Sequence, residues 1–218
     1  MKLLTLTLLR VALLALAAFG APFRIAAAPD GTVLVPIFNG KDLTGWSTAD
    51  IKKVPVPNTT WRVQDGVIVG ENDEKLTGND LWTEKSYGDF VLEFDYRTEG
   101  VDVDSGVDIR EPSFQLQIGM SRSLKRDMTC SWLTDGAGDT SRYPMAGRAI
   151  GWEKYFKAGD WNTLRIEAHG DTFTCWINGN QVSHYSSARY PGPGRIGLQF
   201  HDGLKMKLWF RNIRLAEL

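Results

Sequence analysis

Apolar and polar residues alternate with a period of two along most of the chain, and Gly, Pro, Asn and Asp interrupt the alternation at short intervals. The clearest segment is 90–97, in which Phe90, Leu92, Phe94 and Tyr96 share one face of an expected strand. Further strands are predicted at 33–38, 61–63, 67–69, 79–83, 105–110, 114–118, 161–168, 172–177, 181–185, 194–201 and 205–215. These strands, with short turns and almost no helical periodicity, predict an all-β fold: an antiparallel β-sandwich or jelly roll.

One long segment, 119–159, lacks this alternation. It is rich in Gly, Ser, Asp and Arg and contains Trp132 and Trp152. Irregular segments of this length are uncommon in compact domains, and those that occur usually carry function. We therefore expect this one long irregular loop region to form a wall of a cleft.

The N-terminal 28 residues have the pattern of a secretory signal peptide. Lys2 precedes a leucine-rich stretch, residues 11–19 are wholly apolar, and three alanines occupy 26–28. The apolar run after Arg10 is too short to span about 30 Å of hydrocarbon, which argues against a membrane anchor. The sequence thus predicts a signal peptide at 1–28, a single domain at 29–218, and a secreted or periplasmic protein that leaves the membrane after cleavage.

Composition excludes several classes of protein. The chain has 25 Lys and Arg against 26 Asp and Glu, and its 43% hydrophobic content is enough for a core. This balance argues against nucleic acid as a partner, because such proteins need a basic face. Cys130 and Cys175 are the only cysteines, and without clustered histidines they predict no metal site. We expect no cofactor, and a disulfide between the two cysteines stays open.

Placing the apolar side of each strand in the core predicts which polar residues point outward. If the strands concerned share one sheet, its outer face carries Glu93, Asp95, Asp108, Arg110, Gln115, Gln117, Gln199 and His201. Planar hydrogen-bonding groups of this kind suit a carbohydrate ligand, especially with Trp46, Trp132 or Trp152 as an aromatic platform. The alternative is an ordinary solvated sheet face.

Within this set, His201 is the best candidate for a general base, since imidazole titrates near neutral pH. Glu93 and Asp95 form either a catalytic pair of carboxylates or two surface charges balanced by Arg97 and Arg110. His169 and His184 are interpreted as surface residues. The chain has no phosphate-binding loop, nucleotide fingerprint or Gly-x-Ser-x-Gly motif.

Three parts of the sequence resemble a known family. They are Phe-Asn-Gly-Lys-Asp-Leu-Thr-Gly-Trp at 38–46, Asp-Ser-Gly-Val at 104–107 with Arg110, and Gly-Arg-Ile-Gly-Leu-Gln-Phe-His at 194–201 followed by Phe-Arg-Asn-Ile-Arg-Leu at 210–215. Together they are similar to the 3-keto-disaccharide hydrolase family. The resemblance implies a concanavalin-like β-sandwich and cleavage of the glycosidic bond in 3-keto sugars, by base-assisted elimination and hydration.

Three features depart from the family pattern. Gln115 stands where the family strand usually has Glu, and the Asp commonly found shortly after it is replaced around Gly119 and Met120. Asp104 stands where Asn usually precedes Ser-Gly. An amide cannot exchange protons, so Gln115 favours a second hypothesis, a non-catalytic, lectin-like sugar-binding module. The single domain, with no catalytic partner attached, favours the enzyme.

Overall fold

The computed structural model describes residues 31–49, 58, 60–110, 114–136 and 142–218. The expected signal peptide at 1–28 therefore lies outside the described residues, and its export role stays a prediction. Within the described residues, no helix combines the length and apolar character needed to cross a bilayer.

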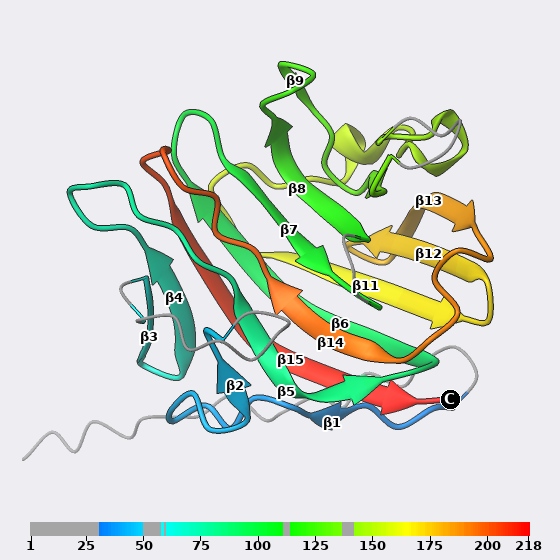
Figure 1. Ribbon diagram of the computed structural model, residues 1–218, viewed down its shortest axis with the longest axis horizontal. Coiled ribbons are helices and arrows are strands. Elements are labelled where there is room, and N and C mark those ends of the chain that lie inside the picture. Colours follow the sequence, from blue (N-terminus) through cyan, green and yellow to red (C-terminus); the bar gives the residue numbers. More distant parts are fainter. Residues whose placement is uncertain (1–30, 50–57, 59, 111–113, 137–141) are drawn as a thin grey trace, which may run out of the picture.

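Two antiparallel sheets face one another, as the alternation predicts (Figure 1). The eight-stranded sheet has the order β13 (Asn180–Ser186), β12 (Thr172–Ile177), β11 (Asn162–His169), β6 (Phe90–Glu99), β15 (Lys207–Glu217), β4 (Val67–Glu71) and β3 (Trp61–Gln64), with β1 (Val35–Pro36) paired to β15. The seven-stranded sheet has the order β10 (Trp132–Leu133), β8 (Gln115–Ser121), β7 (Asp104–Asp108), β14 (Gly194–Leu198), β5 (Leu81–Tyr87) and β2 (Trp46–Ser47), with β9 (Arg126–Asp127) paired to β8. The predicted fold class is confirmed.

The core lies between the sheets and is filled by alternate residues of each strand. Phe90, Leu92, Phe94 and Tyr96 of β6 are each at most 1% exposed, and Leu116 of β8 faces them with no exposed surface. Because one face of each sheet is sealed in this way, the chemistry of the molecule is left to the two outer faces and the connecting segments.

The long segment 119–159 contains β9, β10 and two short 3₁₀ helices, η1 (Met145–Gly147) and η2 (Trp152–Lys154). It lies beside β8, at the margin of the seven-stranded sheet (Figure 1). Cys130, from this segment, and Cys175 of β12 are both fully buried free thiols. The segment is therefore anchored to the sandwich along one of its margins.

Candidate functional site

The candidate site lies on the outer face of the seven-stranded sheet, where β5, β14, β7 and β8 run side by side. Strand register puts Trp82, Gly197, Asp108 and Gln115 in one row across the four strands. In the next row, the amide of Gln199 donates to the carbonyl of Gly106, which pairs with Gln117. Residues in register share a face, so these glutamines converge.

A pocket of about 250 Å³ opens over this face. The sheet contributes Asp104, Gln115, Gln117, Gln199 and His201, and the 119–159 segment contributes Ser121, Arg122, Ser123, Leu133, Arg142 and Tyr143. The long segment therefore walls a pocket, as the sequence predicts. The volume lies below the roughly 300–1,000 Å³ typical of sites for drug-sized ligands, so it fits about one sugar ring.

Gln117 is held on both ends of its amide. Its Nε2 donates to Asp104 Oδ1 at 2.8 Å and to the carbonyl of Met120 at 3.0 Å, and its Oε1 accepts from the Tyr143 hydroxyl at 2.8 Å. Burial raises the pKa of Tyr143, so its hydroxyl stays protonated and donates. Gln117 thus orients the floor of the pocket and ties the long segment to it.

Gln115 and Gln199 each present an acceptor that is not used internally. Their Oε1 atoms are buried and accept no hydrogen bond within the described part of the chain. Gln115 Nε2 lies 3.3 Å from Asp108 Oδ2, which fixes the amide across Gly106. A buried acceptor without a donor is costly, and both glutamines line the pocket, so a ligand hydroxyl that reaches either oxygen would satisfy it. Asp108 itself supports Gln115 from outside the pocket lining.

His201 has a defined tautomer in its neutral form. Its Nδ1 lies 2.9 Å from the carbonyl of Asp202, an acceptor, and 3.1 Å from Asp202 Oδ1. Nδ1 must carry a proton to bond these oxygens, which leaves Nε2 with a free lone pair. The Arg122 guanidinium is 3.5 Å from the same Nδ1. His201 is therefore an oriented base beside an exposed guanidinium.

The sequence analysis missed a carboxyl group beside this histidine. Asp80 directly precedes β5, and burial raises its pKa to about 6, against the opposing effects of a hydrogen bond from the Phe200 amide and the charge of His201. Asp80 falls within the strand predicted at 79–83, but β5 begins at Leu81, and the sequence analysis gave Asp80 no role. Tyr143 and Arg142 were missed because no periodicity governs the long segment.

Glu93 and Asp95 do not belong to this site. Both point outward as predicted, but β6 lies in the other sheet, so the expectation of a single shared face is wrong. Arg214 Nη2 donates to Glu93, and Arg165 Nη1 lies 3.8 Å from it. Asp95 accepts from the Thr163 hydroxyl at 2.7 Å and from Arg211 Nε at 3.3 Å. Both carboxylates are therefore balanced by arginines, but these are Arg165, Arg211 and Arg214 and not the predicted Arg97 and Arg110.

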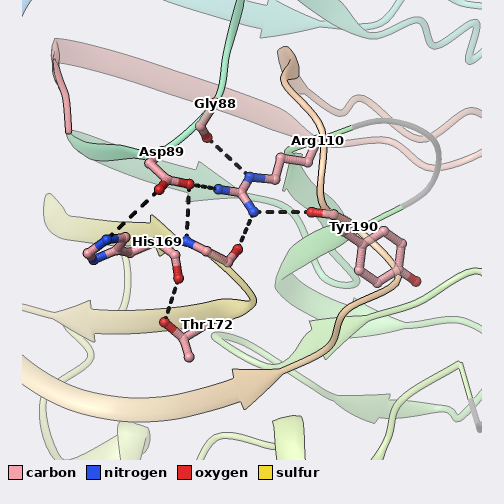
Figure 2. A network of polar contacts seen from close by, with 7 residues as sticks. Gly88, Asp89, Arg110, His169, Thr172 and Tyr190 are labelled. Carbon is pink, nitrogen blue, oxygen red and sulfur yellow. Dashed lines mark hydrogen bonds and ion pairs between the residues drawn. The ribbon is translucent and has the colours of Figure 1, made fainter.

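Arg110 is also placed differently from the prediction. β7 ends at Asp108, and Arg110 has a left-handed φ of 48°, so the alternation no longer applies. Its side chain is buried and donates to the carbonyls of Gly88, Gly170 and Tyr190 and to the Asp89 carboxylate (Figure 2). Arg110 therefore holds together the segments that connect β5 to β6, β11 to β12 and β13 to β14, instead of binding ligand.

The predicted aromatic platforms are core residues. Trp46 pairs with Thr83 on the inner face, and its Nε1 donates to the carbonyl of Ile37 at 3.0 Å. Trp132 pairs with Leu116 and stacks on Phe114 with ring centroids 5.1 Å apart. Trp152, in η2, is also buried. Registry with core residues turns these rings inward, which a two-residue strand does not reveal in the sequence.

A larger hollow of about 520 Å³ lies at the far end of the eight-stranded sheet, lined by residues from 71–72, 99–102 and 204–207. Its polar groups pair among themselves: Lys207 Nζ lies 3.3 Å from Glu71, and Asn72 donates to the carbonyl of Leu204. No set of three metal-ligating side chains converges anywhere in the described residues. The smaller pocket therefore has the stronger chemistry.

Sequence comparison agrees with the resemblance noted above. A family model described as a 3-keto-alpha-glucoside-1,2-lyase-like domain matches residues 34–216. The chain belongs to this family. Membership supports a carbohydrate-related role of glycosidase type. A comparison with curated proteins found no match.

Solved structures confirm the architecture. A provisionally named glycosyl hydrolase from Parabacteroides distasonis is 23% identical over 85% of this chain and 99% of its own, with a TM-score of 0.59. A second such protein from the same organism has 20% identity, coverage of 85% and 94%, and a TM-score of 0.60. A Bacillus subtilis protein with a galectin-like fold has 10% identity, coverage of 72% and 86%, and a TM-score of 0.54. These likenesses concern the fold.

Proposed function

We propose that the protein is a lyase-type or hydrolase-type enzyme that cleaves the glycosidic bond of a 3-keto glycoside bound in the pocket of the seven-stranded sheet. The observation that carries the proposal is His201, whose Nδ1 is engaged by Asp202, so that Nε2 is free to take a proton. An oriented imidazole beside unused amide acceptors is the arrangement that proton abstraction from a bound sugar requires.

The chemistry follows from the ketone. A carbonyl at C3 acidifies the proton on C2, and a base removes it while negative charge develops on the C3 oxygen. The electron pair then forms the C1–C2 double bond as the C1–oxygen bond breaks, and the leaving oxygen takes up a proton. Later addition of water completes hydrolysis. No step requires a redox cofactor on this chain.

The pocket residues divide these tasks. His201 is the base, and the Arg122 guanidinium beside it supports the negative charge that develops on the substrate. Gln115 and Gln199 accept hydrogen bonds from sugar hydroxyls through their unused Oε1 atoms. Gln117, fixed by Asp104 and Tyr143, keeps the floor in place. Arg142 stands at the rim, where it meets the leaving group or its neighbour.

Export belongs to the same proposal. The signal-like segment at 1–28 supports a secreted or periplasmic enzyme, with 29–218 as its single domain. N-terminal sequencing of the protein recovered from a secretion-competent host tests it. A mature chain that still begins at Met1 in the cytoplasm would contradict it.

A second function is favoured by one observation, the amide at Gln115. Gln115 cannot exchange protons, and a pocket without turnover would be a lectin-like binding module on the same face. In that case the protein binds sugars but cleaves no keto-glycoside. Turnover and sugar affinity, measured on the parent and on one variant, therefore separate the two functions.

The test is His201→Ala, with His184→Ala on the eight-stranded sheet as the matched control. His201 is partly exposed, so its loss changes stability by no more than about 0.5 kcal/mol. Turnover of 3-keto glycosides falls roughly 10²- to 10⁴-fold, and sugar affinity falls much less. Turnover is followed by release of the aglycone, affinity by calorimetry, and stability by melting. A His201→Ala protein that cleaves like the parent would refute the assignment.

A further inference from the structure

Asp80 lies against the strand that carries two of the pocket residues, although it does not line the pocket itself. The pairing of β5 with β14 matches Trp82 with Gly197 and Leu81 with Leu198. Continuing this register places Asp80 beside Gln199. Asp80 therefore occupies the outer-face row that contains Gln199, Gly106 and Gln117.

The contact between Asp80 and this strand is direct. Asp80 Oδ1 accepts a hydrogen bond at 3.1 Å from the amide of Phe200, the residue between Gln199 and His201. The Phe200 ring is buried in the core, so the amide has little freedom to move. The carboxylate thus fixes the backbone at the point from which the two pocket side chains diverge.

Gly78, two residues before Asp80, also packs closely against residues 200–202. A Cβ at Gly78 would lie 2.3 Å from the Phe200 carbonyl oxygen and 2.7 Å from the Asp202 amide nitrogen, so only glycine fits there. The chain before β5 therefore packs tightly onto residues 200–202, the segment that includes His201. Shape and hydrogen bonding bind the two segments into one unit.

Charge links them as well. Burial opposes ionisation of Asp80, while the Phe200 amide and the positive form of His201 favour it, and the balance raises the pKa of Asp80 to about 6. The other charged groups facing His201 are Asp202 and Arg122, which contact its Nδ1. Because the positive charge of His201 favours the ionised form of Asp80, ionised Asp80 in turn favours the protonated imidazole.

We propose that Asp80 is a positioning residue of the site, which holds the Gln199–His201 segment through the Phe200 amide and couples its own ionisation to that of His201. The structural part stands on the contacts alone, whereas its consequence for turnover rests on the proposed function. Ionised Asp80 stabilises the protonated imidazole that forms when His201 has taken a proton. Protonation of Asp80 removes that support.

The first experiment needs no substrate. The chain has three histidines, so the ring resonances of His201 are assigned by comparison with His201→Ala and followed by NMR from pH 4 to 9. In Asp80→Asn, which keeps an acceptor for the Phe200 amide, the midpoint of the His201 titration falls by about half a pH unit or more. Asp102→Asn, an exposed carboxylate elsewhere, leaves it unchanged. Identical titrations in the parent and Asp80→Asn overturn the proposal.

The second experiment uses turnover. For the parent, kcat/KM falls toward acid pH as the base becomes protonated, and in Asp80→Asn this limb moves to lower pH with an overall loss of roughly tenfold. Asp80→Ala, which lacks the acceptor, loses more, and the difference between the two variants measures the positioning effect. An acid limb identical in the parent and Asp80→Asn counts against the coupling. If no 3-keto glycoside is cleaved by the parent, the proposed function fails, and the NMR titration still decides the role of Asp80.

If Asp80→Asn does not fold, the parent protein supplies the answer. The side-chain carboxyl carbon of Asp80 is followed directly by NMR, and a midpoint near pH 6, with a matching inflection at the His201 ring, supports the coupling. A carboxyl that titrates near pH 4 with no inflection at His201 overturns it.

Discussion

At the scale of single residues, Asp80 gives the protein a defined pH dependence of stability. Burial raises its pKa from 3.8 to about 6, so between these values the folded state binds a proton more tightly than the unfolded state. Stability contributed by this group is therefore present below about pH 4 and is lost as the pH rises to about 6. The shift corresponds to at most about 3 kcal/mol.

The measurement is the free energy of unfolding in denaturant at several pH values between 4 and 7. Relative to the parent, Asp80→Asn becomes progressively more stable across this range, because the amide never ionises. Asp42 and Glu71, whose pKa values are lowered by hydrogen bonds, act equally in both proteins and cancel in the difference. If the free energies of unfolding of the two proteins changed in parallel with pH, burial would not oppose the ionisation of Asp80.

Which residues were predictable depends on the local backbone. Gln115, Gln117 and Gln199 follow from alternation, because they sit within or directly beside regular strands whose other face is sealed. Arg110 does not, because a left-handed φ two residues past β7 turns it inward. Asp80 was missed because its contact with the Phe200 amide joins segments 120 residues apart, and only the folded chain brings them together.

At the scale of elements, close packing of neighbouring strands decides what the pocket presents. A Cβ at Gly106 would lie 2.4 Å from Gln115 Cδ and 2.7 Å from its Oε1. These atoms belong to a flexible side chain, so the amide would rotate away from the pocket while the strand is preserved. Because Gly106 has no side chain, the Gln115 amide can occupy the space above it.

Gly106→Ala should for this reason weaken ligand binding and leave the fold intact. We expect sugar affinity to fall about tenfold, the equivalent of one lost hydrogen bond, with only a small change in melting temperature. Gly192→Ala, where a Cβ meets nothing within 4 Å, is the control. Calorimetric titration with the sugar that binds the parent measures both. Parent-like affinity in Gly106→Ala would remove Gln115 from the binding contacts.

The strands and their core faces were accessible from sequence because burial imposes a period of two. The assignment of strands to sheets was not, because register and neighbour order depend on long-range pairing. β6 shows this: its alternation was read correctly, yet it pairs with β11 and β15, away from β7, β8 and β14. The error moved Glu93 and Asp95 to the wrong face.

At the scale of the whole molecule, the two outer faces of the sandwich have different chemistry. The seven-stranded sheet holds amides, an imidazole and unused acceptors under the long segment. On the eight-stranded sheet, the carboxylates of β6 are neutralised by arginines from neighbouring strands, and one of these arginines, Arg211, also lies over the ring of the half-buried Trp161. The first face is built to receive a ligand and the second to hold strands together.

Glu93→Gln tests this division of roles. Glu93 is 8% exposed and lies between Arg214 and Arg165, so the amide removes the negative charge that both guanidiniums face. We expect the free energy of unfolding to fall by about 2–4 kcal/mol, while sugar affinity and turnover per folded molecule stay at the parent's values. Glu167→Gln, on the same face and without an ion pair in the described chain, is the control and changes neither. A Glu93→Gln protein that keeps its stability and loses turnover would contradict this division of roles, because a carboxylate of the eight-stranded sheet would then be acting on substrate.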